Sequence, residues 1–265
     1  MKDKRIAIIG CGNLGRSILK GLIDDQEFPN SNVIATKRDL STLDDLIEFG
    51  VEFTSDNVEA IKGSEIILVA LKPHNILDVL AEIKEHLDPE KHILVSLATG
   101  ISIEQIQKAV VVQVPIFRAM PNTAADVAEA VTCICSNSTN ENELRSVKYF
   151  FDKIGFTIVI DESLMESATV LGACGIAYAL RFIRAMVQGG IQIGFDAKTA
   201  SSIVDQTVKG AAQLLIERKE HPEFEIDKVT TPKGCTIEGL NEMEHNGFSS
   251  ALIKGIVASF EKIDK

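Results

Sequence analysis

Three glycines near the amino terminus, Gly10, Gly12 and Gly15, are the first residues whose spacing suggests chemistry. An apolar run precedes them and a helical pattern follows, which is the context in which a GxGxxG turn binds a dinucleotide. The first glycine permits a tight turn, the second lets a pyrophosphate approach the backbone, and the third allows close packing of helix and strand. Free N–H groups at the helix amino terminus favour an anion. A glycine-rich turn without a ligand is the alternative. We expect a nicotinamide cofactor to bind through Gly10, Gly12, Asn13, Leu14 and Gly15.

The end of the second predicted strand indicates which dinucleotide binds. An NAD-specific domain has an acidic residue there, about 20 residues past the turn. This chain has Thr36, Lys37 and Arg38 instead. A hydroxyl and two cations suit the 2′-phosphate of NADP, which arginine engages in fork geometry. A solvated basic loop is the alternative, and the neighbouring Asp39 weakens the pattern. The prediction is NADPH as cofactor, with NADH possible.

Three later strands are predicted to end in small or amide-bearing residues. One ends on the Lys72-Pro73 bend, the next leads into Ala98, and a third leads into Met120-Pro121-Asn122. Ligands of doubly wound sheets bind at the carboxyl edge, where these strands end. A nicotinamide would lie there, and we expect Ala98 to line its site. For Lys72 the alternative is a surface lysine before a turn, and backbone contacts are expected to matter more than its charge.

A last segment of interest, 229–240, lies near the other end of the chain. It reads VTTPKGCTIEGL, with hydroxyls, proline and glycine ahead of a helical pattern. Such residues cap a helix, and the unpaired N–H groups of its first turn are able to bind a small carboxylate. By itself, the segment is also explained as a capping motif that binds no ligand.

The elements that must position these residues alternate along the first part of the chain. Short apolar runs separated by helix-length segments predict an α/β, Rossmann-type, doubly wound parallel sheet. We expect a dinucleotide-binding domain over 1–160 and an all-α helical domain over 161–265, because no strand pattern appears after about residue 159. The predicted strands are 5–9, 32–35, 66–71, 92–96, 113–118 and 130–135. The predicted helices are 14–24, 41–49, 76–86, 103–109, 162–193, 197–219 and 234–262.

The first helix of the second domain is apolar over most of its circumference. Such a helix must be buried, either in its own domain or against another subunit. About 105 residues remain for this domain, so a helical interface shared in a homodimer is expected.

Composition excludes several classes of partner. The net charge of −11 offers no basic surface for nucleic acid or anionic lipid. The five cysteines form no CxxC pair and the histidines are scattered, so reduced thiols and no metal site are expected. The start of the chain runs into a strand without an apolar leader, and Arg181 and Arg184 interrupt the apolar run near 170–180. We expect no membrane span and a cytoplasmic protein.

Taken together, these segments resemble pyrroline-5-carboxylate reductase, the family that completes proline biosynthesis by reducing a cyclic imine with NADPH. The resemblance covers nearly the whole chain and is most specific in the MPNT and TPKGCTIEGL segments. It implies a Rossmann domain followed by a helical domain that intertwines with its partner in a homodimer, sometimes assembled into a ring of dimers. The matching segments are IAIIGCGNLG, ILVALKPHNILDVL, VSLATGISIEQI, FRAMPNTAADVAEAVT and VTTPKGCTIEGL.

The resemblance also implies roles for individual residues. Thr236 is the catalytic hydroxyl that meets the substrate ring nitrogen, and the backbone of Gly234, Cys235 and Thr236 takes its carboxylate. Met120 and Asn122 lie near the substrate. The residues implied to line the cofactor are Ala70, Lys72, Pro73 and Pro121.

The chain departs from the family pattern at two places. Lys233-Gly234 stands where the family generally has two glycines, and the segment 174–178 lacks the proline of the usual Ser-Gly-Pro-Ala-Tyr run. Without that proline we expect a straighter helix. Both changes leave the substrate preference open, including acceptance of six-membered imines.

Two other functions remain open on the residues alone. One is a reductase of another cyclic imine or small acid on the same scaffold. A hydroxyacid dehydrogenase would bring a catalytic lysine, but Lys198 and Lys209 lack its Gly-x-x-x-Lys-x-x-x-Asn surroundings. The other is a noncatalytic NADP-binding protein that reports redox state, which would bind cofactor without consuming it.

Overall fold

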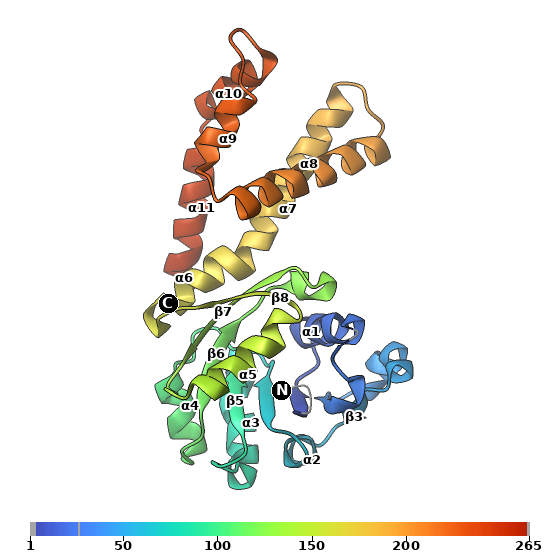
Figure 1. The fold of residues 1–265 in the computed structure, drawn as a ribbon, viewed down its shortest axis with the longest axis vertical. Coiled ribbons are helices and arrows are strands. Elements are labelled where there is room, and N and C mark those ends of the chain that lie inside the picture. Colours follow the sequence, from blue (N-terminus) through green and yellow to red (C-terminus); the bar gives the residue numbers. More distant parts are fainter. Residues whose placement is uncertain (1–3, 26, 264–265) are drawn as a thin grey trace. The chain divides into compact units, whose positions relative to one another are not determined.

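In the computed structural model, which describes residues 4–25 and 27–263, the amino-terminal part is built around an eight-stranded sheet (Figure 1). The strands are β1 (Ile6–Ile9), β2 (Val33–Thr36), β3 (Glu52–Thr54), β4 (Ile66–Val69), β5 (Ile93–Ser96), β6 (Ile116–Met120), β7 (Ala130–Ser136) and β8 (Gly155–Val159). Their order is β3-β2-β1-β4-β5-β6-β7-β8. Neighbouring strands run parallel except β6 and β7, which run antiparallel. The expected α/β doubly wound sheet is confirmed, with one reversed pair.

Helices cover both faces of this sheet because alternate strand residues point to opposite sides. Ile8 packs with Ile18 of one helix in one core cluster, and Ile9 packs with Ile76 of another helix in a second cluster. All four residues are at most 1% exposed, as expected for central parallel strands. The helices of this part are α1 (Asn13–Asp24), α2 (Asn57–Lys62), α3 (Pro73–Ile83), α4 (Ile103–Val110), α5 (Glu141–Asp152) and α6 (Met165–Ala168).

Several elements differ from the sequence-based expectation. The strands β3 and β8 and the helices α2 and α5 were not predicted; both strands carry exposed side chains and so lack a continuous apolar run. The segment Leu40–Phe49 is a 3₁₀ helix (η2) instead of the expected α-helix. These differences change the rim of the sheet and leave its central strands as predicted.

The chain after β8 is helical. A π-helical turn (η6, Thr169–Cys174) follows α6 directly, so this segment is not the straight α-helix expected from the missing proline. The first compact unit ends at Ile176, and the second spans Ala177–Lys262. The division expected after residue 160 stays a prediction. The helices from here on are α7 (Gly175–Gln192), α8 (Ala197–Arg218), α9 (Pro222–Lys228), α10 (Cys235–His245) and α11 (Phe248–Ile263).

The second unit has little core of its own. Its core cluster contains the buried residues Val187, Ala200 and Val204. The helices α9, α10 and α11 have no buried residue, whereas many large apolar side chains of this unit are exposed. The single helix expected over 234–262 is two helices, because Gly247 adopts a φ of +77° between them. An apolar surface of this extent is typical of an interface.

Candidate cofactor and substrate sites

The glycine turn lies where the strand order of the sheet reverses. The strand β1 pairs with β2 on one side and with β4 on the other, so the carboxyl ends of β1 and β4 form a topological switch point. Gly10 follows β1 there with a φ of +91°, and an added Cβ would lie 2.9 Å from the Ala70 carbonyl oxygen. The Cys11 N–H donates to the Thr36 carbonyl at 2.8 Å. Only glycine fits Gly10 without moving the backbone at the end of β4.

The other two glycines have different surroundings. A Cβ on Gly15 would lie 2.6 Å from the Gly10 carbonyl oxygen, so Gly15 allows α1 to pack closely on the turn. Gly12, the N-cap of α1, has no atom within 4 Å of an added Cβ. The first turn of α1 carries no acidic residue. The helix amino terminus and the open space beside Gly12 therefore fit a pyrophosphate.

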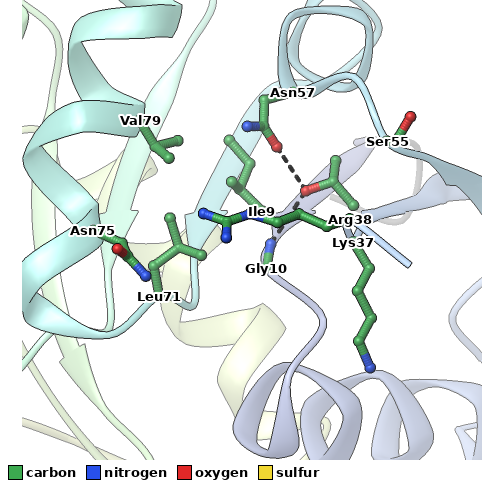
Figure 2. A pocket seen from close by; sticks show the side chains of 10 residues that line it. Ile9, Gly10, Lys37, Arg38, Ser55, Asn57, Leu71, Asn75 and Val79 are labelled. Atoms are coloured by element: carbon green, nitrogen blue, oxygen red, sulfur yellow. Dashed lines mark hydrogen bonds between the residues drawn. The ribbon is translucent and has the colours of Figure 1, made fainter. Parts of the chain in front are cut away.

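A pocket of about 400 Å³ opens beside the turn (Figure 2). It brings together three of the predicted cofactor residues, Thr36, Lys37 and Arg38, with Gly10. Its other lining residues were not predicted, namely Ile9, Ser55, Asn57, Leu71, Asn75 and Val79. Ser55 and Asn57 follow β3, whose carboxyl end lies beside that of β2. Predicting β3 would have pointed to them, but its short and partly exposed sequence gives no strand signal.

The hydroxyl of Thr36 is already engaged inside this pocket. It accepts from the Gly10 N–H at 3.2 Å and donates to Asn57 Oδ1 at 2.8 Å, and Thr36 is 2% exposed. The hydroxyl therefore orients Gly10 and Asn57, and it has no further proton to give to a phosphate.

The two cations of the pocket have no ion pair with any described residue. Figure 2 shows Arg38 extending toward Leu71 and Asn75, and Lys37 extending in another direction. The adjacent Asp39 caps η2, where it accepts from the N–H of Ser41 at 3.1 Å and from its hydroxyl at 2.7 Å. These hydrogen bonds hold the pKa of Asp39 below its usual value. Its carboxylate is engaged there and forms no ion pair with Lys37 or Arg38.

Four further predicted cofactor residues, Ala70, Lys72, Pro73 and Ala98, follow strands at the same edge of the sheet. The Ala70 N–H donates to the Ile9 carbonyl at 2.8 Å, Lys72 is the exposed N-cap of α3, and Pro73 is its first residue. Ala98 follows β5 and is 3% exposed. The pocket in Figure 2 includes none of these four residues.

Met120 is the last residue of β6, and Asn122 lies two residues beyond it. Both are 5% exposed, and Pro121 between them is also buried. The Asn122 side chain donates through Nδ2 to the Gly172 carbonyl at 3.0 Å and accepts from the Ala124 N–H at 3.1 Å. The amide of Asn122 therefore has a structural role, which connects the end of β6 to the π-helical turn.

The predicted substrate cap begins α10 in the second unit. Gly234 is the N-cap, and its N–H donates to the Thr231 carbonyl at 2.9 Å. The N–H groups of Cys235 and Thr236 and the Thr236 hydroxyl make no hydrogen bond to a described residue. Lys233 precedes the cap with a φ of +57°, the region that glycine prefers. Of the expected backbone donors, Cys235 and Thr236 are thus open, and Gly234 is engaged.

No group of His, Cys, Asp and Glu among residues 4–25 and 27–263 is arranged to hold a metal ion. All five cysteines are free, and burial raises the pKa of the Cys11 and Cys135 thiols to about 11.

Comparisons with known proteins agree across nearly the whole chain. Residues 162–265 match the family model for pyrroline-5-carboxylate reductase dimerisation, and residues 5–100 match that of NADP oxidoreductase, coenzyme F420-dependent. The chain is 46% identical to pyrroline-5-carboxylate reductase 1 of Dictyostelium discoideum, covering 98% of this chain and 49% of that protein. It is 42% identical to reductase 2 of the same organism, covering 99% of this chain and 93% of that protein.

Two solved structures are similar over the same extent. The NADP-bound pyrroline carboxylate reductase of Plasmodium falciparum has a TM-score of 0.89 at 25% identity, covering 99% of this chain and 98% of that one. The pyrroline-5-carboxylate reductase of Coxiella burnetii has a TM-score of 0.89 at 30% identity, covering 98% of this chain and 97% of that one. The likeness therefore includes both the sheet and the helical part.

Proposed function

This chain belongs to the pyrroline-5-carboxylate reductase family, and we propose that its glycine turn and its α10 cap serve the reaction of that family. It is an NAD(P)H-dependent oxidoreductase that reduces the C=N bond of 1-pyrroline-5-carboxylate to give L-proline. This reaction is the last step of proline biosynthesis. The assignment to this site is supported by the open glycine turn at the switch point, which lies beside two cations that form no ion pair with a described residue.

The residues present fit NADPH. The open space at Gly12 would accept a pyrophosphate, and the positive charge of Lys37 and Arg38 would favour a 2′-phosphate over a free hydroxyl. A bound dinucleotide supplies the hydride. The chain itself would bind and orient the cofactor and the substrate.

We assign the substrate to the α10 cap. The open N–H groups of Cys235 and Thr236 and the positive end of the helix dipole favour the substrate carboxylate. The Thr236 hydroxyl has no protein partner in the described chain, so it is free to contact the ring nitrogen. A protonated cyclic imine is already electrophilic, and orientation is therefore the main contribution required of the protein. Met120, Pro121 and Asn122 would lie near the reacting groups, with Asn122 holding the shape of that segment.

The chain oligomerises through its helical region, as the dimerisation family of residues 162–265 indicates. By length and composition alone the helical run Glu162–Gln192 would also be able to cross a membrane, although Arg181 and Arg184 lie in it. Only 11% of its most apolar window is buried within one chain. We propose that a second copy covers this surface in a homodimer or a ring of dimers, and that the enzyme is cytoplasmic.

One experiment tests the function directly. Purified protein is given 1-pyrroline-5-carboxylate with NADPH and, separately, with NADH, while absorbance at the reduced-nicotinamide band and formation of proline are followed. We expect proline to form in equal amount to the NADPH consumed. NADPH binding by calorimetry without consumption would instead indicate a noncatalytic redox reporter, and turnover of only a six-membered imine would indicate a reductase of another substrate.

A further inference from the structure

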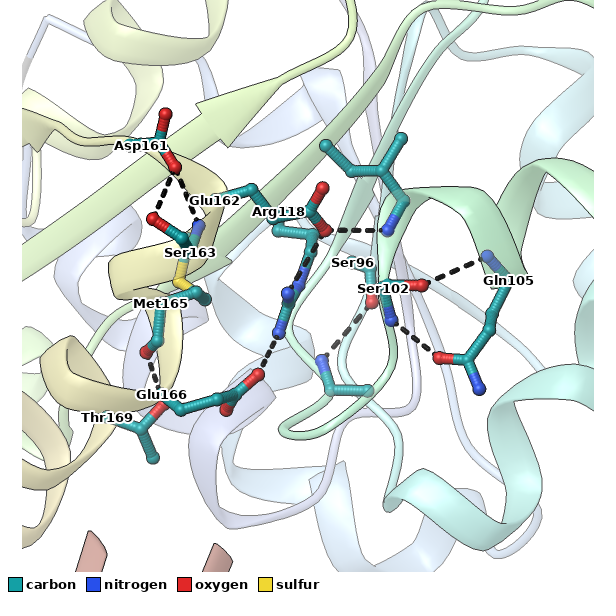
Figure 3. A network of polar contacts seen from close by, with 12 residues as sticks. Ser96, Ser102, Gln105, Arg118, Asp161, Glu162, Ser163, Met165, Glu166 and Thr169 are labelled. Atoms are coloured by element: carbon teal, nitrogen blue, oxygen red, sulfur yellow. Dashed lines mark hydrogen bonds and ion pairs between the residues drawn. The ribbon is translucent and has the colours of Figure 1, made fainter. Parts of the chain in front are cut away.

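A buried arginine connects the strand that leads to the predicted substrate segment with two carboxylates (Figure 3). Arg118 lies on β6 and is 3% exposed. Its Nη1 lies 3.1 Å from Glu162 Oε1, and its Nη2 lies 2.8 Å from Glu166 Oε1. The two carboxylates belong to the 3₁₀ turn Glu162–Leu164 and to α6. Arg118 therefore holds two parts of the segment after β8 against the central sheet.

One of these two carboxylates, that of Glu162, also contacts the amino terminus of α4. Glu162 Oε1 also accepts from the Ile103 N–H at 2.8 Å. Ile103 is the first residue of α4, which begins with a capping box between Ser102 and Gln105. The carboxylate of Glu162 thus lies between the positive end of a helix and a guanidinium, an arrangement that fixes its position.

Two residues farther along, the strand becomes the Met120-Pro121-Asn122 segment. Asn122 donates to the carbonyl of Gly172 in the π-helical turn η6. The segment is thereby fixed at both ends, by the Arg118 ion pairs before it and by the Asn122 hydrogen bond after it. Single π-helical turns within helices are frequently found at functional sites.

Stability alone does not account for these ion pairs. Desolvation of a buried ion pair offsets much of its attraction, and well-packed apolar residues are often as stable. Here the arrangement also leaves Arg118 Nε and Glu166 Oε2 buried without a hydrogen-bond partner. Two ion pairs on one guanidinium define the position of the strand end, which apolar packing does not.

We propose that Arg118 is a positioning residue for hydride transfer: its ion pairs with Glu162 and Glu166 fix the Met120-Pro121-Asn122 segment where the reduced ring and the imine must meet. The proposal rests on the proposed function of this segment. It predicts a larger effect on the chemical step than on the KM for NADPH, because the pocket with Lys37 and Arg38 contains none of Arg118, Glu162 and Glu166.

The test compares Arg118→Met, Arg118→Lys and Glu166→Gln with the wild type. Arg145→Met is the matched control, because Arg145 forms an exposed ion pair with Glu141 on α5, with side chains 64% and 80% exposed. For each variant we would measure kcat, the KM values for NADPH and imine, the thermal midpoint, and the deuterium isotope effect on kcat with NADPH deuterated at the transferred position.

We expect Arg118→Met to lower kcat about tenfold to a hundredfold, the scale of a small misplacement of reacting groups. The KM for NADPH should change less than about twofold, and the isotope effect on kcat should increase as hydride transfer becomes slower. Arg118→Lys should recover part of kcat, and Glu166→Gln, which keeps the arginine, should show a smaller loss. A lower thermal midpoint with unchanged kcat and isotope effect per folded enzyme would overturn the proposal.

Failure of the proposed function gives a different result. In that case the wild type itself would not reduce the imine. Amide hydrogen exchange then still tests the positioning role: Arg118→Met should accelerate exchange in residues 116–127 more than in β1 and β4, and Arg145→Met should not. Unchanged exchange in 116–127 would contradict the role whether or not the enzyme turns over.

Discussion

At the scale of single residues, the proposed sites combine polar groups that have no partner among the described residues with polar groups that the protein already engages. The Thr236 hydroxyl makes no hydrogen bond to a described residue, and Lys37 and Arg38 make no ion pair with one. By contrast, Asp39, Thr36 and Asn122 engage their side chains within the protein. The open groups are the ones that substitutions should reveal in kinetics, because their removal leaves the folded chain unchanged.

Replacing Thr236 by valine removes the hydroxyl and keeps the shape. We expect kcat/KM for 1-pyrroline-5-carboxylate to fall about tenfold to a hundredfold, which corresponds to roughly 1.5 to 3 kcal/mol for the removal of one polar interaction with the substrate. Steady-state kinetics at saturating NADPH measures this value. Thr236→Ser is the control, since it keeps the hydroxyl and should retain most activity; unchanged turnover in Thr236→Val would rule out the role.

Replacing both Lys37 and Arg38 by alanine removes two positive charges from the lining of the pocket. The KM for NADPH should rise far more than the KM for NADH, because only NADPH carries the 2′-phosphate that these cations would bind. Parallel initial-rate measurements with the two cofactors give the ratio. Lys108→Ala, which removes an exposed cation from α4, is the control. An equal rise for both cofactors would contradict the NADP assignment.

The buried thiol of Cys11 makes stability depend on pH. Burial raises its pKa from 9.0 to about 11 despite the nearby charges of Lys37 and Arg16, which lower it. The unfolded thiol loses its proton near pH 9 and the folded one near pH 11, so its contribution is present below pH 9 and is lost as pH rises to 11. At pH 10 the loss is about 1.4 kcal/mol.

Cys11→Ala removes this contribution. Urea unfolding at pH 8 and pH 10 should therefore show a smaller loss of unfolding free energy in Cys11→Ala than in the wild type. The exposed Cys235 provides the control, because Cys235→Ala should follow the wild type. An identical pH dependence in wild type and Cys11→Ala would show that the thiol ionises equally easily in both states.

At the scale of elements, two glycines of the turn between β1 and α1 should have different roles, Gly12 in cofactor binding and Gly15 in folding. Gly15→Ala brings a Cβ to 2.6 Å from the Gly10 carbonyl, whereas Gly12→Ala places its Cβ in open space. We expect Gly12→Ala to weaken NADPH binding with little change in unfolding free energy. Gly15→Ala should lower the unfolding free energy by about 1 to 3 kcal/mol. Calorimetric titration and urea unfolding measure the two quantities, and equal effects in both variants would contradict this division.

The central elements were predictable and the rim was not, for a physical reason. Strands β1, β4 and β5 are buried on both faces and read as continuous apolar runs, so their carboxyl ends could be located from the sequence. The strand β3 has three partly exposed residues and no such run. Ser55 and Asn57, which follow it, were therefore missed as pocket residues.

The partners of Arg118 were also beyond prediction. Glu162 and Glu166 lie 44 and 48 residues from Arg118 in the chain. Nothing in local spacing indicates that an arginine in an apolar strand faces these two carboxylates, because the interaction depends on how the chain returns after β8. The residues of the α10 cap were identified through the resemblance to a family, since a helix cap by itself has no specific ligand.

At the scale of the whole molecule, we propose that the exposed apolar surface of the second unit forms the interface of the homodimer. In α11, Ile253, Val257 and Phe260 follow helical spacing and are 60%, 49% and 36% exposed. Val257→Glu should shift the protein from dimer toward monomer, because a buried charge in an apolar interface is costly. Sedimentation velocity over a range of concentrations measures the shift.

Lys254→Glu is the control for this substitution, since it changes charge on the same helix outside the apolar stripe. It should leave the sedimentation coefficient unchanged. If Val257→Glu also sediments as the wild type does, this stripe of α11 is not part of the subunit interface.

The scarcity of buried residues in the second unit has a kinetic consequence. Val187, Ala200 and Val204 are the buried residues of the core cluster of this unit, so we expect the unit to be weakly stable in a single chain. In the homodimer that we propose, the unit would acquire its final stability only when two chains meet. Recovery of activity after dilution from denaturant would accordingly become second order in chain concentration when the protein is dilute, and the cell would obtain active enzyme at a rate set by encounters between newly made chains.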